Sequence, residues 1–319
     1  MPRKSTSFVH RPVMVRQVTT IFEPVPPGVV VDATVGGGGH ARVLLETHAQ
    51  ISVLGLDRDE DALAAATAEL APFGPRVRLR RARFDRLREV VHDEGLEGVS
   101  GVLFDLGVSS PQLDRPERGF SYRCEGPLDM RMDRDQELTA ADLVNGAGQD
   151  ELARILADYG DERFARRVAA AIVAARPIRT TTELADVVRT AIPAAARRRG
   201  GHPAKRTFQA LRIAVNDELT VLGPAIDDAI DLLVGGGRCA VLAYHSGEDR
   251  IVKQRFHRAA TGGCSCPQQL PCSCGAVPTV RLLRRGAWRP TPGEIEANPR
   301  AESARLRAVE RLSTGERAA

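Results

Sequence analysis

The sequence of 319 residues predicts an α/β fold in which a parallel sheet, covered by helices, is interrupted by an inserted all-helical segment. Three observations support this prediction. Short apolar runs typical of buried strands alternate with helical periodicity between residues 29 and 105. Helical periodicity alone continues from about residue 114 to residue 203, and a strand pattern returns at residues 237–244. The chain therefore leaves the sheet and later returns to it.

The first expected strand covers residues 29–32 and ends in Asp32, and four glycines at residues 36–39 separate it from an amphipathic helical pattern. Glycine adopts positive φ without strain and lets a ligand approach the main chain, while the N–H groups that open a helix donate to ligands. With Ala41, these glycines match the fingerprint G-x-G-x-x-G/A, which is weak evidence by itself. The pattern predicts a nucleotide-type cofactor site.

The second expected strand, residues 51–57, ends in Asp57, about twenty residues beyond the glycines. An acid in this position accepts hydrogen bonds from both hydroxyl groups of a ribose, so it favours a ligand that contains adenosine. NAD and S-adenosylmethionine (SAM) both meet that condition. Asp32 favours SAM, because a carboxylate beside the glycines attracts the cationic methionine end of SAM and repels a pyrophosphate.

The later elements continue the alternation. We expect a helix at residues 60–70, a third strand within the basic run 76–83, a helix at 87–94 and a fourth strand at 101–105. The inserted segment has helical periodicity at residues 140–144, 150–159, 164–175 and 182–192, and two further helices, 207–222 and 225–234, lead back to the sheet. Ligands of open α/β sheets bind outside the carboxyl ends of the strands, so Asp105 should face the same crevice as the glycines.

Composition excludes several classes of protein. Hydrophobic residues make up 43% of the chain, and no apolar run approaches the roughly 20 residues that a bilayer span needs. The polar N-terminal segment lacks the apolar core of a secretory signal, so we expect a cytoplasmic protein with no membrane partner. The six cysteines should then be reduced thiols or metal ligands rather than disulfides. The sequence does not indicate the oligomeric state, for which a homodimer is one option.

The net charge is only +4, but arginines gather in three segments. They lie at residues 76–83, at residues 197–206, and around Trp288 at residues 281–289. Each segment alone is more readily explained as a solvated face. The three together favour a nucleic acid as the partner, because they offer cations to its phosphates. Such binding weakens steeply as salt is added.

A set of longer motifs makes the prediction specific. Residues 105–114, 118–122 and 127–133 read DLGVSSPQLD, RGFSY and PLDMRMD, and together they resemble the signature of the RsmH (MraW) family of bacterial 16S ribosomal RNA cytosine-N4 methyltransferases. The agreement extends along nearly the whole chain, through residues 10–14, 208–219, 244–253 and 298–307. Residues 243–249 depart from the family pattern, with AYHSGED in place of SFHSLED. The changes at Ala243 and Gly247 leave the polar residues in place.

The resemblance implies a SAM-dependent methyltransferase fold, a Rossmann-like sheet with a helical domain inserted after the fourth strand. Residues 1–113 and 207–319 would form a discontinuous methyltransferase domain, and residues 114–206 an inserted domain that recognises the substrate. The implied reaction moves the methyl group of SAM to the exocyclic N4 amine of a cytosine in the decoding (P-site) region of 16S rRNA, within the small ribosomal subunit. SAM supplies the electrophile, so the reaction requires no metal.

The family motifs also imply the residues of the site. They are Gly38, Gly39 and His40 for the methionine end of SAM, Asp57 for its ribose, and Phe84, Asp105 and Gln112 for the adenine and the surroundings of the methyl group. Two of these residues have simpler explanations as well. Phe84 could be a core aromatic, and His40 could be a solvated residue at the start of a helix.

The acceptor amine is a poor nucleophile because its lone pair is delocalised into the cytosine ring. The enzyme must therefore orient the amine and accept a hydrogen bond from it. Asp105 is the first candidate for this acceptor, although it could serve only the cofactor. His245, in the loop after the returning strand, could take the released proton, and the sequence does not decide between them. The base must also leave its stack, and the inserted segment with its basic loop is the expected clamp.

Other classes of protein share parts of this pattern. A DNA amino-methyltransferase would show Asp/Asn/Ser-Pro-Pro-aromatic after the fourth strand, whereas this chain has Asp105-Leu106-Gly107-Val108. An NAD-dependent oxidoreductase would share the glycines but would not need three basic segments. A non-catalytic RNA-binding protein is disfavoured by the intact set of cofactor motifs.

Four cysteines form two C-x-C units five residues apart, Cys264 with Cys266 and Cys272 with Cys274. Four thiolates could hold zinc in a tetrahedral site. The usual zinc spacing, however, places two or more residues between paired cysteines, and the expected chemistry needs no metal. The pattern therefore favours a metal-free surface loop with reduced thiols, and the sequence leaves zinc binding open.

Overall fold

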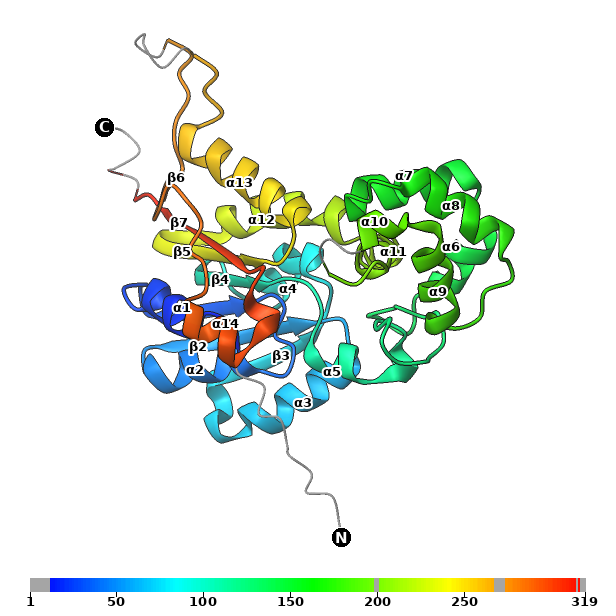
Figure 1. The fold of residues 1–319 in the computed structure, drawn as a ribbon. Helices are drawn as coiled ribbons and strands as arrows, with labels where there is room; N and C mark the ends of the chain where they lie inside the picture. Colours follow the sequence, from blue (N-terminus) through cyan, green and yellow to red (C-terminus); the bar gives the residue numbers. More distant parts are fainter. Residues whose placement is uncertain (1–11, 198–200, 267–272, 314, 316–319) are drawn as a thin grey trace. The chain divides into compact units, whose positions relative to one another are not determined.

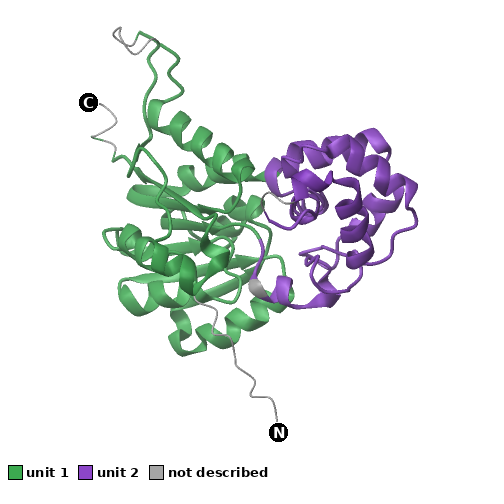
Figure 2. Ribbon diagram, viewed as in Figure 1, with its two compact units in different colours: residues 1–107, 221–319 green, residues 108–220 purple. Residues whose placement is uncertain are grey.

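The computed structural model describes residues 12–197, 201–266, 273–313 and 315. The chain divides into two compact units, residues 1–107 with 221–319 and residues 108–220, which are green and purple in Figure 2. The helical insertion expected at residues 114–206 lies within the second unit, and its role in substrate recognition stays a prediction. Among the described residues, no helix is long and apolar enough to cross a membrane.

The first unit is built on a sheet whose seven described strands follow the order β3-β2-β1-β4-β5-β7-β6. The strands are β1 (Gly28–Asp32), β2 (Ile51–Asp57), β3 (Val77–Arg81), β4 (Val99–Asp105), β5 (Leu233–Ala243), β6 (Val280–Leu282) and β7 (Arg305–Arg311). Strands β1 to β5 pair in parallel, while β7 runs antiparallel to both β5 and β6. This order confirms the predicted α/β class. Because β2 and β4 lie on opposite sides of β1, the crevice for a ligand opens at the carboxyl end of β1.

Alternate side chains of the strands face opposite sides of the sheet. Val31 and Phe104 share one apolar core with residues of α4, α12 and α13, and Val30 shares another with residues of α1. The helices of this unit are α1 (Val15–Phe22), α2 (Gly39–Thr47), α3 (Glu60–Leu70), α4 (Leu87–Asp93), α12 (Glu218–Leu232), α13 (Ser246–Thr261) and α14 (Pro292–Ala297). Figure 1 shows α12 and α13 along one side of the sheet and α1 and α2 along the other.

The second unit consists mainly of helices. They are α5 (Ser110–Asp114), α6 (Ala140–Gly146), α7 (Gln149–Gly160), α8 (Ala165–Ala174), α9 (Thr181–Ala191), α10 (Ala194–Arg197) and α11 (Lys205–Asn216). Leu152, Leu156 and Leu211 are fully buried in its core. The helices expected at residues 140–144, 150–159, 164–175 and 182–192 are all present, with ends that differ by one or two residues.

The helices that return to the sheet divide at a different place from the one the sequence predicts. The expected helix 207–222 is interrupted at Asp217, which adopts the left-handed conformation with φ of 50° and ends α11. Helix α12 starts at the next residue, and its Glu218 accepts two hydrogen bonds from Arg212 at 2.9 and 2.8 Å. The prediction of helices at 207–222 and 225–234 is therefore wrong in its boundary, because apolar periodicity does not register a single left-handed residue.

Candidate active site

Three carboxylates end neighbouring strands of the first unit. Asp32 ends β1, Asp57 ends β2 and Asp105 ends β4, all at the carboxyl edge of the sheet. Parallel pairing of β1 with both neighbours brings these strand ends to one crevice. The prediction that Asp105 and Asp57 share an edge with the glycine loop is confirmed by this topology.

The glycine loop between β1 and α2 needs glycine for backbone reasons. Gly36 and Gly38 have φ of 51° and 86°, in the left-handed region, and Gly38 is the residue that caps α2. A Cβ on Gly39 would lie 2.6 Å from the ring of Pro12, whereas one on Gly37 would meet nothing within 4 Å. The loop is therefore packed where it enters α2 and open at Gly37, which leaves room for a ligand to approach the main chain.

Asp57 fastens this loop to the end of β2. Its Oδ2 accepts a hydrogen bond of 2.9 Å from the Gly36 N–H, and its Oδ1 accepts one of 2.9 Å from the Asp59 N–H. Burial raises the pKa of Asp57 in spite of these bonds. A carboxylate oxygen has two lone pairs, so each oxygen retains a second position from which to accept a ribose hydroxyl. The predicted ribose role thus fits this geometry, and a structural role for Asp57 accompanies it.

Asp32, at the carboxyl end of β1, is fully buried. Its Oδ1 accepts a hydrogen bond of 3.3 Å from the Thr34 N–H. Burial, and next the negative charge of Asp105, raise the pKa of Asp32 to about 8. A cation brought into this crevice would relieve that repulsion. SAM carries two, the sulfonium and the ammonium group, so the acidic groups present fit this cofactor better than they fit an anionic one.

Asp105 is held by groups on three different elements. Its N–H donates to Thr34 Oγ1 at 2.6 Å, its Oδ1 accepts a hydrogen bond of 2.7 Å from the Tyr244 hydroxyl, and its Oδ2 lies 3.6 Å from His40 Nε2. The carboxylate side chain is 24% exposed, while the His40 ring is buried at 5%. The simpler explanation of His40 as a solvated residue therefore does not hold, because the ring is packed at the start of α2 and lies beside Asp105, and its predicted role in cofactor binding stays a prediction.

Tyr244 is a residue that the sequence analysis missed. Burial, and next the charge of Asp105, raise its pKa well above the usual value, so the phenol stays protonated and donates to the carboxylate. The signal was present in the sequence, because Tyr244 stands where the similar family has phenylalanine, at the end of the returning strand. Only the pairing of β5 with β4 shows that this hydroxyl reaches Asp105.

The described contacts of the His245 side chain are with the first turn of α13, the helix that it precedes. It caps α13: its Nδ1 accepts the Glu248 N–H at 3.4 Å, and its Nε2 lies 3.2 Å from Glu248 Oε1. Glu248 is buried and also accepts a hydrogen bond of 2.7 Å from the Tyr244 N–H. This arrangement favours a positioning role for His245, which fixes the start of α13 and the backbone beside Tyr244. Its role as proton acceptor stays a prediction.

The two remaining predicted cofactor residues lie in different units. Phe84, in the short helix Phe84–Arg86, is half-buried and packs edge-on against Phe104 with ring centroids 5.8 Å apart. Gln112 belongs to the second unit, where its side chain is buried at 6% and its Oε1 accepts the Ser109 N–H at 3.0 Å. Phe84 therefore has a packing role in addition to the predicted one, and the contact of Gln112 with the cofactor stays a prediction.

The first basic segment is largely neutralised. Arg78 and Arg80 both pair with Glu94, at 2.9 and 2.5 Å, and Arg81 pairs with Glu60 at 2.5 Å. These ion pairs tie β3 to the helices that flank it. The face of β3 is therefore a weaker candidate for phosphate binding than the sequence indicated.

Of the other two basic segments, residues 197–206 are only partly described, whereas residues 281–289 are described in full. Arg198 and Arg199 lie outside the described residues, and Arg206 donates to the carbonyl of Asp161 at 3.1 Å. At residues 281–289, Arg281 pairs with Glu310, and Arg284 lies 5.7 Å from the centre of the Trp288 ring. Arg285 and Arg289 are exposed. These exposed arginines stay candidates for contacts with phosphate.

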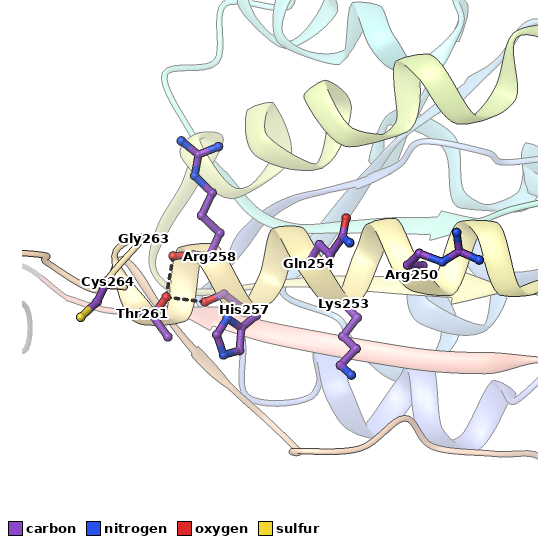
Figure 3. A pocket seen from close by; sticks show the side chains of 8 residues that line it. All are labelled: Arg250, Lys253, Gln254, His257, Arg258, Thr261, Gly263 and Cys264. Carbon is purple, nitrogen blue, oxygen red and sulfur yellow. Dashed lines mark hydrogen bonds between the residues drawn. The ribbon is translucent and has the colours of Figure 1, made fainter. Parts of the chain in front are cut away.

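A further group of basic side chains lies on the outer face of α13. Arg250, Lys253, His257 and Arg258 are exposed and line an open pocket of about 530 Å³ (Figure 3). In the described part of the chain, no carboxylate pairs with Arg250, Lys253 or Arg258, in contrast to the arginines of β3. The sequence analysis missed this face, although the spacing of these residues by three and four places them together on a helix. We call these four residues the α13 cationic face.

Comparisons with known proteins agree along the whole chain. A family model described as the MraW methylase family matches residues 7–312. The chain is 52% identical over 311 residues to the ribosomal RNA small subunit methyltransferase H of Heliobacterium modesticaldum, covering 96% of this chain and 99% of that protein. It is 52% identical over 316 residues to the protein of the same name from Thermobifida fusca, covering 97% and 95%. A solved rRNA methylase structure from Streptococcus thermophilus aligns with 96% of this chain and all of that chain, at 14% identity and a TM-score of 0.43.

Proposed function

The chain belongs to the MraW methylase family, and from this premise we propose that it methylates the exocyclic N4 amine of a cytosine in the decoding region of 16S rRNA. The donor is SAM, and the enzyme is an rRNA methyltransferase of the small ribosomal subunit. We place it in the cytoplasm, where that substrate is assembled. The observation that carries the proposal is the Asp105 carboxylate, fixed at the end of β4 on the same sheet edge as the glycine loop.

SAM would supply an electrophilic methyl group. The protein therefore needs to bind and orient SAM and the cytosine and to exclude water from them, and it needs no covalent intermediate. Gly38, Gly39 and His40, at the start of α2, would hold its methionine end, and Asp57 would hold its ribose. The ionised Asp32 carboxylate would balance the positive charge of SAM. Burial and the charge of Asp105 disfavour that ionised form when no cation is bound, so the carboxylate and the cation would stabilise each other. Phe84 and Gln112 would bound the adenine.

Asp105 would accept a hydrogen bond from the cytosine amine. That bond draws the amine toward a pyramidal geometry and makes its lone pair available for attack. The Tyr244 hydroxyl, which donates to Oδ1, holds the carboxylate in place for this contact. Asp105 is thus the catalytic residue of this proposal. Tyr244 is a positioning residue that sets the orientation of that carboxylate, and His245 sets the backbone next to it. The proton that the amine releases would pass to Asp105 or to His245.

The substrate must present its cytosine unstacked, and its backbone must be held by cations. The α13 cationic face supplies positive charge without a carboxylate partner among the described residues of the first unit, and Arg285 and Arg289 add to it. We assign the phosphate contacts of the rRNA to these groups in preference to the arginines of β3, which already have carboxylate partners. Exposed cations of this kind attract phosphate without first breaking an ion pair.

The proposal is tested by methyl transfer from radiolabelled SAM to three acceptors. These are small ribosomal subunits that lack the modification, naked 16S rRNA, and duplex DNA. We expect the label in rRNA, and mass spectrometry of the digested nucleosides should identify N4-methylcytosine. Label in 5-methylcytosine, or preferential labelling of DNA, would overturn the proposal.

A further inference from the structure

The loop that follows α13 brings three sulfur atoms together. The Sγ atoms of Cys264, Cys266 and Cys274 all lie within 4.8 Å of one another. Cys264 and Cys266 come just after the end of α13, and Cys274 lies on the limb of the loop that leads to β6. Figure 3 shows Cys264 immediately beyond the last turn of the helix. Residues eight to ten positions apart in the sequence therefore point at one spot.

The base of this loop is closed by the main chain. Gly262 ends α13 in the left-handed conformation, with φ of 60°, and a Cβ added to it would lie 2.5 Å from the backbone nitrogen of Val277. Two residues further on, the Thr279 N–H donates to the Ala259 carbonyl at 3.0 Å. The two limbs are thus in close backbone contact at their base, and the cysteines meet beyond it.

The backbone turns tightly at the cysteines. Gly263 and Gly275, one next to each limb's cysteine, have φ of 75° and 69°. The Cys266 N–H donates to the Cys264 sulfur at 3.4 Å. A hydrogen bond from a backbone N–H stabilises the negative charge of a thiolate, which is the form that binds metal.

We propose that Cys264, Cys266 and Cys274 bind a structural zinc ion. Thiolate ligands select zinc among the common divalent ions, and Zn–S bonds of about 2.3 Å place the sulfurs about 3.8 Å apart, which fits inside the observed separation. The short C-x-C spacing disfavoured zinc in the sequence analysis. That spacing, however, says nothing about the distance between the two limbs of the loop, and the structure brings the limbs together. Cys272 lies outside the described residues and is not part of the proposed site.

A metal here would stabilise a loop that side-chain packing cannot. Few apolar residues occur between Gly262 and Val277, and Val277 itself is 52% exposed. Burial of apolar surface therefore contributes little to the stability of this segment, and a metal cross-link would supply stabilising free energy in its place. The site is separate from the proposed methyl transfer, which needs no metal. The zinc proposal and the methyltransferase proposal can therefore be tested independently.

The test is the metal content of the full-length protein, purified under reducing conditions without chelator. We expect about one zinc ion per chain by elemental analysis, and loss of most of it in Cys264→Ser and in Cys274→Ser. Cys124→Ser is the matched control, because Cys124 is an exposed cysteine of the second unit and should leave the zinc content unchanged. Cobalt exchanged into the parent protein should give the intense near-ultraviolet absorption of thiolate ligation.

A variant could lose zinc only because it is misfolded, so SAM affinity serves as the second measurement. Both serine variants should bind SAM as the parent does while losing zinc. The proposal is overturned by zinc well below one ion per chain in the parent after incubation with equimolar zinc. It is overturned equally by a disulfide between two of the three cysteines, or by serine variants that keep the metal.

Discussion

At the scale of single residues, the site brings three carboxyl groups together where a cation is to bind. Asp32 is fully buried and Asp57 is partly buried, and burial raises the pKa of each. Asp105 adds a third carboxylate, oriented by Tyr244. Without a bound cation, ionising all three carboxyl groups is unfavourable. Such an unfavourable free energy is expected in a site that is complementary to a sulfonium ligand. The behaviour of two of these carboxylates can be measured directly.

The first prediction concerns the proton on Asp32. Its pKa of about 8 means that the carboxyl is protonated at neutral pH in the SAM-free protein. Bound SAM would lower that pKa, so binding should release a proton, and the affinity for SAM should increase with rising pH, by up to about tenfold per unit, until about pH 8. Calorimetry at neutral pH in two buffers of different ionisation enthalpy measures the released proton.

The effect on stability has the opposite sign. Since the pKa of folded Asp32 lies above its unfolded value of 3.8, the folded state binds more protons between these values, and its free energy of unfolding falls as pH rises from about 4 to about 8. Asp32→Asn should remove both the proton release and this part of the pH dependence. A binding enthalpy independent of the buffer would contradict the assignment.

The second prediction concerns Asp57. The variant Asp57→Ala removes both the ribose acceptor and the anchor of the Gly36 N–H, so SAM affinity should fall roughly 10- to 150-fold, equivalent to about 1.5–3 kcal/mol. Titration calorimetry measures the affinity, and Glu60→Ala, an exposed acid near the same strand end, is the control that should change little. Unchanged SAM affinity in Asp57→Ala, or tight NAD binding by the parent protein, would be incompatible with the proposed site.

At the scale of elements, the signature segments position one another through hydrogen bonds. The buried side chain of Asn216, at the end of α11, donates to the Met130 carbonyl at 2.7 Å and accepts the Met132 N–H at 2.9 Å. Arg118 donates to the Met132 carbonyl at 3.2 Å. Motifs that resemble the family's signature are therefore, in part, hydrogen-bond partners of one another. Helix α13 differs, because Arg250 and Lys253 on its outer face form no ion pair with a carboxylate of the described residues.

The element-scale prediction concerns the α13 cationic face. In Arg250→Gln/Lys253→Gln, RNA affinity should fall, and the slope of log affinity against log salt should shrink by roughly 0.7–0.9 for each phosphate that the variant no longer neutralises. Filter binding at several salt concentrations measures the slope. The matched control is Arg42→Gln/Arg86→Gln, which removes two exposed arginines that already pair with glutamates. If both double variants leave the slope unchanged, the face is only solvated.

At the scale of the whole molecule, much of the fold could be predicted because it rests on periodicity. The buried parallel strands, the glycine turn and the inserted helices all have strong apolar patterns or special residues. β6 and β7 were not predicted, since charged residues interrupt the apolar pattern of β7, and β6, the edge strand beside it, has only three residues. Their antiparallel pairing depends on contacts between distant segments, which no local pattern contains.

The candidate site was predictable to a similar degree. Residues at strand ends follow from the topology, so Asp32, Asp57 and Asp105 could be located in advance. The partner of Asp105 could not, because Tyr244 lies 139 residues away and reaches it only through the pairing of β4 with β5. Likewise, ion pairs such as Arg78 with Glu94 decide which arginines remain for RNA, and these pairs depend on tertiary packing.

The central claim is that the Asp105 carboxylate accepts the hydrogen bond of the cytosine amine. The most direct test is single-turnover methyl transfer by Asp105→Asn, measured on small ribosomal subunits beside SAM and subunit binding. The amide keeps the shape of the carboxylate but loses its charge, so transfer at saturating SAM should slow by about 100-fold or more while the affinity for the subunit stays near that of the parent. Tyr244→Phe should give a smaller loss, as it removes only the bond that orients the carboxylate. Transfer at the parental rate by Asp105→Asn would contradict the account.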